Sequence, residues 1–188
     1  MTYYNAEHYC DPTAGAAEQH INDQARVVGA ARAGKGAMMQ SVTFRVPGPP
    51  QGKARPRFRT VGGKVMPYTP ASTRRYEEQI AAMYRRAGGL RLEPPIRVEV
   101  LAVFGVPKSY SKRRRSECLQ NITPPEVKPD VDNISKSVLD ALNKLAYGDD
   151  SKVSTLMVTK RYGAPEGLVI RVTGQAPATE EQLEEVGG

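Results

Sequence analysis

The chain has 188 residues, enough for one domain with a proper core but crowded for two. Hydrophobic residues make up 39%, Trp is absent, and no run approaches the roughly 18 apolar residues of a membrane span. Cys10 and Cys118 lie far apart and fit neither a disulfide framework nor a zinc site. Composition therefore argues against membrane and disulfide-stabilised secreted proteins, and we expect a reducing, cytoplasmic setting.

Charge is distributed unevenly along the chain. Residues 1–40 carry 3 Lys or Arg against 4 Asp or Glu, residues 41–128 carry 18 against 6, and residues 129–188 carry 6 against 10. The formal net charge of +7 therefore arises from a central zone of net +12. Such asymmetry is typical of a protein that binds a polyanion, although a solvated basic face that only maintains solubility has the same composition.

The first part of the chain, residues 1–39, is rich in Ala, Gly, Gln and Asn and shows no sustained period, which predicts a flexible extension. Apolar and polar residues then alternate from 40 to 46, which predicts a half-buried strand that ends at Pro47. A basic loop, G-K-A-R-P-R-F-R, follows at 52–59, and a short strand is predicted at 64–68.

A helix is predicted over 71–87, because apolar and aromatic residues recur there at helical spacing and Gly88-Gly89 follows. Residues 96–104 form the clearest predicted strand, since they alternate and then run apolar toward a buried end. The segment S-Y-S-K-R-R-R-S-E at 109–117 is interpreted as a polar, basic insertion.

Two further strand-like runs, 153–162 and 168–173, are joined by G-A-P-E-G and predict a β-hairpin. Residues 175–188 are acidic and poor in apolar residues, which predicts a mobile tail. The order of elements predicts an α+β fold: a single small domain over 40–174, in which two main helices pack on a mixed β-sheet.

The stretch K-P-D-V-D-N-I-S-K-S-V-L-D-A-L-N-K-L-A-Y-G-D-D at 128–150 holds five aspartates. With a helix over 131–145 turning about 100° per residue, one face forms an apolar stripe that is predicted to enter the core. This stripe consists of Ile134, Val138, Ala141, Leu142 and Leu145. Asp132, Lys136 and Asp140 follow one another at four-residue intervals on the opposite face.

These residue types predict a metal site. Asp130 and Asp132 stand at the predicted helix start with Lys136 one turn inward, and a third carboxylate, Asp149 or Asp150, follows the helix. Mg²⁺ needs only two or three carboxylates plus substrate phosphate, and it can polarise a phosphodiester and generate hydroxide at neutral pH. The lysine would stabilise charge that develops on the phosphoryl oxygens.

A purely structural explanation of the same residues stays open. Aspartates at a helix N-terminus cap the helix and favour its dipole, Asp132 and Lys136 have the spacing of an ordinary ion pair, and Asp149-Asp150 suits an ordinary turn. A phosphotransferase D-x-D motif follows an apolar strand, whereas the residues that precede Asp130 here are polar and proline-rich.

The pattern from Lys128 to Val153 resembles the signature of the RusA family of Holliday junction resolvases. In that family an acid-x-Asp-Asn-x-x-Lys-x-x-x-Asp-Ala-Leu run is followed by Asp-Asp and a Val-containing strand. The basic loop at 52–58 and Y-T-P-A-S-T-R-R-Y-E-E at 68–78 are also similar to family segments. Residues 1–39 have no counterpart in this likeness, and 109–128 is longer and more basic than a minimal member needs.

The resemblance implies a small α+β domain that forms a symmetric homodimer, binds four-way DNA junctions and cleaves paired strands with Mg²⁺, for which Mn²⁺ is a candidate substitute. It also implies a protein of bacterial or phage type. Carried over by position, it implies metal-binding, catalytic aspartates at Asp130, Asp132 and Asp150 and an essential lysine at Lys136. The matching residues Asn133, Asp140 and Asp149 are expected to support them.

Two basic segments are expected to bind DNA phosphates without reading sequence. They are Lys53, Arg55, Arg57 and Arg59 in the first loop, and Lys112, Arg113, Arg114 and Arg115 in the insertion, for which a merely solvated loop is an equal alternative. Phe58 either belongs to a small core or inserts into a DNA junction. Tyr76 and Tyr84 are expected in the core or at a dimer contact.

We therefore expect a Mg²⁺-dependent, structure-selective endonuclease that resolves Holliday junctions in DNA recombination and repair. Two alternatives remain: a non-catalytic nucleic-acid-binding protein, and a nuclease of the same fold that cuts flaps, forks or RNA. The first predicts binding that falls steeply with salt and ignores Mg²⁺. The second predicts comparable cleavage of unbranched nucleic acid.

Overall fold

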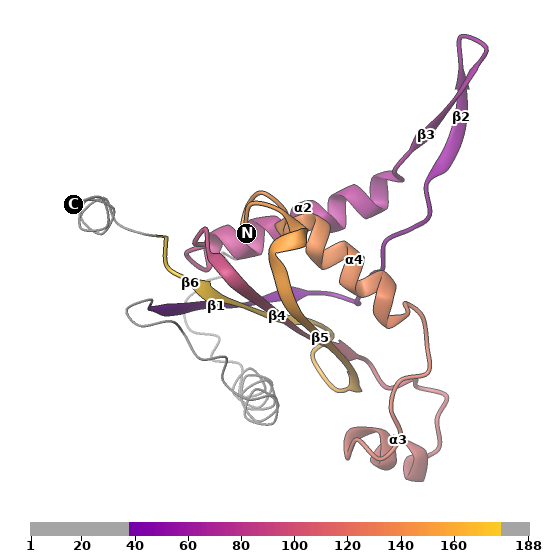
Figure 1. The fold of residues 1–188 in the computed structure, drawn as a ribbon. Helices are drawn as coiled ribbons and strands as arrows, with labels where there is room; N and C mark the ends of the chain where they lie inside the picture. Colours follow the sequence, from indigo (N-terminus) through magenta and orange to yellow (C-terminus); the bar gives the residue numbers. More distant parts are fainter. Residues whose placement is uncertain (1–37, 178–188) are drawn as a thin grey trace, which may run out of the picture. The chain divides into compact units, whose positions relative to one another are not determined.

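The structure is a computed structural model that describes residues 38–177 (Figure 1). The predicted N-terminal extension up to residue 37 and most of the predicted acidic tail lie outside the described residues. The elements in chain order are β1 (Met39–Pro47), β2 (Arg57–Val61), β3 (Lys64–Tyr68), α2 (Ala71–Arg86), β4 (Glu93–Phe104), α3 (Lys112–Leu119), α4 (Val131–Leu142), a 3₁₀ turn (Asp150–Lys152), β5 (Val153–Tyr162) and β6 (Gly167–Gln175).

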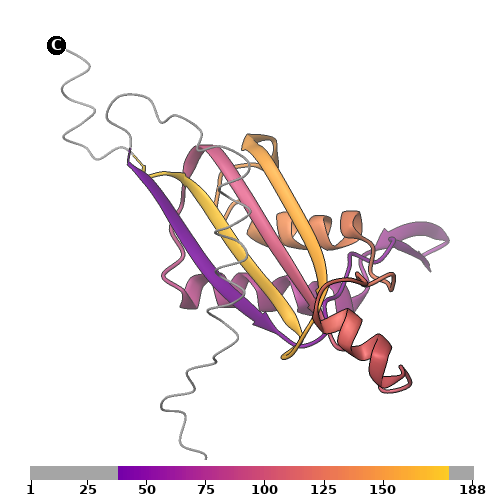
Figure 2. The same ribbon diagram turned by 90° about the horizontal axis from the view of Figure 1, so that it is seen from below.

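Four strands form one mixed sheet in the order β1-β6-β4-β5 (Figure 2). Strand β6 is antiparallel to both β1 and β4, whereas β5 is parallel to β4. The chain segment between the parallel strands β4 and β5 carries α3 and α4, as a parallel connection requires a crossover. The expected α+β class with a mixed sheet is confirmed.

The predicted β-hairpin of the last two strands is wrong, because β4 lies between them. The two strands are still mutually antiparallel, since one is parallel and the other antiparallel to β4. Passing over one intervening strand spans about 10 Å, and the four residues 163–166 reach roughly 13 Å when extended. The short link is therefore compatible both with direct pairing of β5 and β6 and with a passage over one strand. In the structure β4 lies between them and pairs with both.

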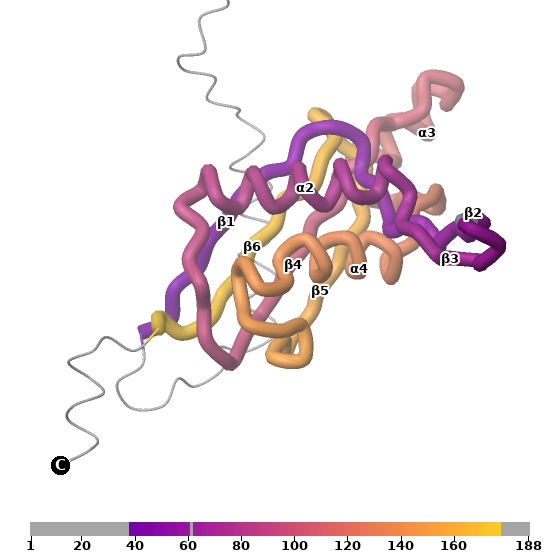
Figure 3. Tube along the Cα trace, turned by 90° about the horizontal axis from the view of Figure 1, so that it is seen from above, coloured from indigo at the N-terminus to yellow at the C-terminus, as the bar shows by residue number. Residues whose placement is uncertain are grey.

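Helices α2 and α4 lie side by side over one face of the four-stranded sheet (Figure 3). That face is apolar because alternate residues of each strand point to it, including Val42, Phe44 and Val46 of β1. These strand residues form one buried cluster with the helices. The predicted stripe of α4 is confirmed: Ile134, Val138 and Leu142 are buried, and Ala141 and Leu145 pack partly buried against the cluster.

Helix α2 is held by two tyrosines that the sequence placed in the core or at a dimer contact. Tyr76 and Tyr84 are both buried, and the ring of Tyr84 meets that of Phe44 edge-on with centroids 5.4 Å apart. The Tyr84 hydroxyl donates a hydrogen bond to the carbonyl of Leu90, in the turn that follows the helix. A buried phenol needs such a partner, so this bond fixes the exit of the chain toward β4.

Three local predictions need correction. The basic loop at 52–59 is a strand from Arg57 onward, because β2 pairs with β3 as a separate two-stranded sheet. The basic insertion contains a helix, α3, whose N-cap Ser111 accepts a hydrogen bond from the Arg114 amide. Helix α4 ends at Leu142 rather than near 145, because Asn143 is extended and Lys144 has a positive φ.

Within residues 38–177, no helix has the length and apolar character needed to cross a membrane. Cys118 is buried and free, while Cys10 lies outside the described residues.

Candidate active site and nucleic-acid surface

The N-terminal end of α4 presents two carboxylates to solvent. Asp130 occupies the N-cap position, yet its side chain makes no capping hydrogen bond, and only its backbone carbonyl accepts from the Ile134 amide at 3.1 Å. Asp132 lies in the first turn, on the face opposite the buried stripe. The capping explanation of Asp130 therefore has no support in the side-chain contacts.

Lys136 lies one turn inward and pairs with Asp132, with Nζ 3.2 Å from Oδ2. Both side chains are about 60% exposed (60% for the lysine and 64% for the aspartate). An exposed pair at this spacing contributes only about 0.3–0.5 kcal/mol to stability. The ion pair is thus too weak to keep either group from a stronger partner such as a metal ion or a phosphate.

A loop ahead of β2 packs against this helix start. The Lys53 amide donates to the Asn133 carbonyl at 2.9 Å. A Cβ added to Gly52 would lie 2.8 Å from the Cβ atoms of both Asn133 and Pro129, so only glycine allows this approach. Beside this contact lies an open groove of about 680 Å³, with Lys53, Arg55, Lys128 and Asp130 among its lining residues.

Lys53 holds the loop by its side chain as well. Its ammonium pairs with Asp140 of α4 and lies 3.6 Å from Oε1 of Glu77 on α2. Burial alone would lower the pKa of Lys53, but the hydrogen bond and charge of Asp140, with Glu77, outweigh it and raise the pKa. Lys53 is therefore a cation tied down by two carboxylates, whereas Arg55, Arg57 and Arg59 are exposed.

The second acidic pair lies beyond the other end of α4. The Asp149 carboxylate accepts from the Ser151 amide at 3.0 Å and so caps the 3₁₀ turn. Asp150 is exposed in that turn. Burial raises the pKa of Tyr147, and the negative charges of Asp150 and Asp140 raise it further, so both carboxylates act on the same phenol.

The structure thus brings together only some of the predicted site residues. Helix α4 has 12 residues and spans about 18 Å, with Asp130 and Asp132 at its start and Asp150 past its end. Among the described residues, no three His, Cys, Asp or Glu side chains lie close enough to form a metal-binding group. Asp140 joins Lys53 rather than the two N-terminal carboxylates.

The donors at the start of α4 nevertheless suit a hard cation. Asp130 and Asp132 supply two exposed carboxylates, and the former makes no capping bond. Mg²⁺ prefers oxygen ligands, keeps several waters and is usually held by one or two carboxylates together with substrate phosphates. This pair fits such an ion without a third protein ligand.

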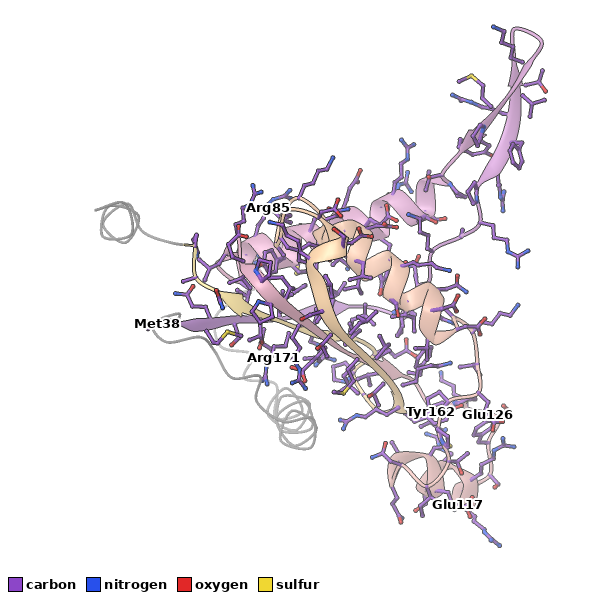
Figure 4. The ribbon with its side chains drawn as sticks, viewed as in Figure 1. Met38, Arg85, Glu117, Glu126, Tyr162 and Arg171 are labelled. Carbon is purple, nitrogen blue, oxygen red and sulfur yellow. The ribbon has the colours of Figure 1, made fainter. Side chains whose placement is uncertain are left out.

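The second basic segment forms α3 and its arginines are partly engaged within the chain. Arg113 Nε donates to Glu117 at 2.9 Å, the guanidinium of Arg114 lies 4.1 Å from the Tyr110 ring centroid, and Arg115 donates to the Pro107 carbonyl at 3.4 Å. Figure 4 shows Glu117 on this helix, away from the β2–β3 strands. The two basic segments therefore belong to separate surfaces.

Sequence reasoning missed two features of the site. It treated Asp140 as a general supporting residue, whereas its contact is with Lys53, 87 positions away in the chain. It also missed the β2–β3 hairpin, although Gly62-Gly63 between two short strand-like runs is a recognisable turn signal.

Comparison with known proteins gives an independent indication of the family. The family model described as "Endodeoxyribonuclease RusA" matches residues 47–173. A protein of Bacillus subtilis (strain 168), named "Uncharacterized protein YqaN", is 36% identical over 128 residues, which cover 66% of this chain and 89% of that protein. The matched segment includes the loop, the β2–β3 hairpin and the whole of α4.

Proposed function

Because this chain belongs to the RusA family of endodeoxyribonucleases, we propose that it resolves Holliday junctions by paired, Mg²⁺-dependent cleavage of DNA as a homodimer. A four-way junction has two-fold symmetry, and two equivalent cuts need two equivalent active sites. A symmetric pair of chains supplies them. The proposal includes function in DNA recombination and repair.

The observation that carries the proposal is the solvent-exposed pair of carboxylates at the start of α4. Asp130 stands at the N-cap without a capping bond and lines a groove that also has Lys53, Arg55 and Lys128 in its walls. Asp132 is solvent-exposed two residues later. Cationic walls attract a phosphodiester backbone, and the carboxylates are then the groups that meet it. Acidic side chains in such a position favour metal binding over direct contact with phosphate.

The residues of the chain have distinct tasks in this scheme. A Mg²⁺ ion held by Asp130 and Asp132 would polarise the phosphodiester and acidify a bound water. Lys136 exchanges its weak contact with Asp132 for the phosphoryl oxygens, where charge grows in the transition state. Arg55 orients the backbone in the groove. Asp150 as a third metal ligand stays a prediction, since it lies past the other end of α4.

The test uses an end-labelled four-way junction and a matched linear duplex, each with and without Mg²⁺. We expect paired nicks only in the junction and only with metal. The Asp132→Asn variant should bind the junction like the unsubstituted protein and lose cleavage by at least a hundredfold. Asp150→Asn measured beside it decides the third ligand: an equal loss supports it, and unchanged cleavage removes Asp150 from the site.

One observation favours a second candidate, a nucleic-acid-binding protein without catalysis. The described residues contain no group of three metal-binding side chains, and Asp132 already has a partner in Lys136. This candidate predicts binding that weakens steeply with salt, no response to Mg²⁺, and no cleavage of any substrate. This candidate is rejected if the unsubstituted protein cleaves a junction and the Asp132→Asn variant does not.

A further inference from the structure

The β2–β3 hairpin is exposed, and within residues 38–177 no layer packs on either side of it. It pairs only with itself and extends past the N-terminal end of α2, away from the four-stranded sheet (Figure 1). Its turn uses Gly62 and Gly63 at φ 58° and 77°, the geometry of a tight two-residue hairpin. An isolated two-stranded hairpin is marginally stable in water, so one that carries apolar side chains is expected to meet a partner.

The strand register divides the hairpin into two unlike faces. Phe58 lies opposite Pro67, and Thr60 lies opposite Val65, so these four residues share one face. Phe58 is 68% exposed and Val65 is 67% exposed. We call this face the apolar hairpin face. Because Phe58 is exposed on it, the prediction that Phe58 belongs to a small core is wrong.

The opposite hairpin face is cationic. Arg57 lies opposite Tyr68, and Arg59 lies opposite Met66. The guanidinium of Arg59 lies 5.8 Å from the Tyr68 ring centroid, which confirms that they share a face. Both arginines are exposed.

Charge identifies the kind of partner. The segment from Pro47 to Tyr76 contains seven Lys or Arg residues and no Asp or Glu. A protein partner would need a strongly acidic surface around an apolar centre. Among the described residues of this chain, such an excess of acid occurs only in the candidate active site at 130–150. Nucleic acid combines both requirements, because phosphates pair with cations while unstacked bases offer apolar faces to aromatic side chains.

The hairpin also lies within reach of the carboxylate pair. Gly52 contacts the start of α4, and Phe58 lies only six positions after it in the chain. Six extended residues span at most about 20 Å, which corresponds to roughly six nucleotides along one strand. A side chain at that range can engage a branch point while the carboxylates face a phosphodiester close to it.

We propose that the hairpin is a branch-point wedge, in which Phe58 stacks on a base unpaired at the crossover while Arg57 and Arg59 hold the adjoining phosphates. This inference rests on the proposed function for its substrate, branched DNA. It deepens that function, since it assigns the preference for branched over linear DNA to the apolar hairpin face. Linear duplex offers no unstacked base, so there the face finds no partner.

The test reads base unstacking directly. A four-way junction carries 2-aminopurine next to the crossover, and its emission is measured with protein in the cleavage-deficient Asp132→Asn background. We expect emission to rise on binding, to stay low with Phe58→Ala, and to recover with Phe58→Tyr. Leu90→Ala is the matched control, since Leu90 is 42% exposed and follows the C-terminal end of α2, whereas the hairpin precedes the N-terminal end of that helix. Arg85, labelled in Figure 4, marks the C-terminal end.

Cleavage gives a second readout in the otherwise unsubstituted chain. Phe58→Ala should cut a fully paired junction about tenfold more slowly, within the roughly five- to hundredfold range of one lost base stack. Cleavage should return toward the original rate on a junction with two mismatched, already open base pairs at the crossover. Leu90→Ala should cut both junctions at the original rate.

The outcomes separate this inference from the proposed function. If the unsubstituted protein cuts junctions but Phe58→Ala leaves both emission and cleavage unchanged, the wedge is wrong and the nuclease stands. If emission rises without any cleavage, the wedge stands and the nuclease fails. If Phe58→Ala turns a dimer into a monomer in sedimentation and slows every substrate equally, the apolar hairpin face is a subunit contact and the wedge is overturned.

Discussion

Replacement of Gly52 by alanine tests whether the basic loop is seated on α4 as the structure shows. The new Cβ would lie 2.8 Å from the Cβ atoms of Pro129 and Asn133. Ordinary contact begins at 3.4 Å, so the loop and the helix start must separate by about 0.6 Å or more. The substitution adds a single methyl group and no charge, and it therefore isolates the effect of this contact.

The cost follows from what that separation breaks. Inserting a methyl group into a packed contact typically costs about 1–3 kcal/mol. The hydrogen bond from the Lys53 amide to the Asn133 carbonyl, 2.9 Å long, bridges the same two segments and is lengthened by the same shift. We expect the free energy of unfolding to fall by about 1–3 kcal/mol. Junction cleavage should slow about tenfold or more, since a 1 Å misplacement can cost about a hundredfold.

Urea unfolding followed by far-ultraviolet circular dichroism measures the stability, and single-turnover cleavage of a four-way junction measures the activity. Gly148→Ala is the stability control, because its Cβ would meet only the flexible ends of Arg91 and Lys152, at 3.3 and 3.4 Å. It should change the free energy of unfolding by less than about 0.5 kcal/mol. If Gly52→Ala matches this control and keeps full cleavage, the seating of the loop on α4 is refuted.

Two further predictions concern groups that hold the site in place. Asp140→Asn removes the main partner of Lys53. Because both side chains are about one-third exposed (32% and 38%), the free energy of unfolding should fall by less than about 1 kcal/mol. Hydrogen exchange at the Lys53 amide should become faster, and cleavage should become slower. Equal exchange in both proteins would contradict this role. Burial raises the pKa of Tyr84 from 10.0 to about 12, so the unfolded chain loses this proton first as pH rises. The contribution of Tyr84 to stability is therefore fully present below about pH 10 and falls toward pH 12. Over this pH range the urea midpoint of Tyr84→Phe should fall less steeply than that of the unsubstituted protein, and an identical slope would rule out the contribution of Tyr84.

The most accurate expectations came from patterns that are local in the chain. The apolar stripe of α4 depends on residues three and four apart, which meet on one helix face wherever the helix is placed. Ile134, Val138 and Leu142 are accordingly all buried. The alternation in β1 predicted its buried face for the same reason, since successive side chains of a strand point to opposite sides.

The expectations that failed depended on which segments become neighbours. The link at 163–166 permits either direct pairing of β5 with β6 or a passage over β4, and only the packing of the whole sheet selects the second. The end of α4 differs from its predicted position for a comparable reason. Leu145 keeps its contact with the core, but the chain around it turns at Asn143 and Lys144 to reach β5.

The site shows the same division between sequence and structure. The sequence by itself determined the family and the acidic motif, because the types and spacings of Asp130, Asp132 and Lys136 can be recognised on a helix of any placement. Only the tertiary structure joined Lys53 to Asp140 and left Phe58 exposed on a separate hairpin. Those outcomes depend on contacts between segments distant in the chain, whose free energy no local pattern contains.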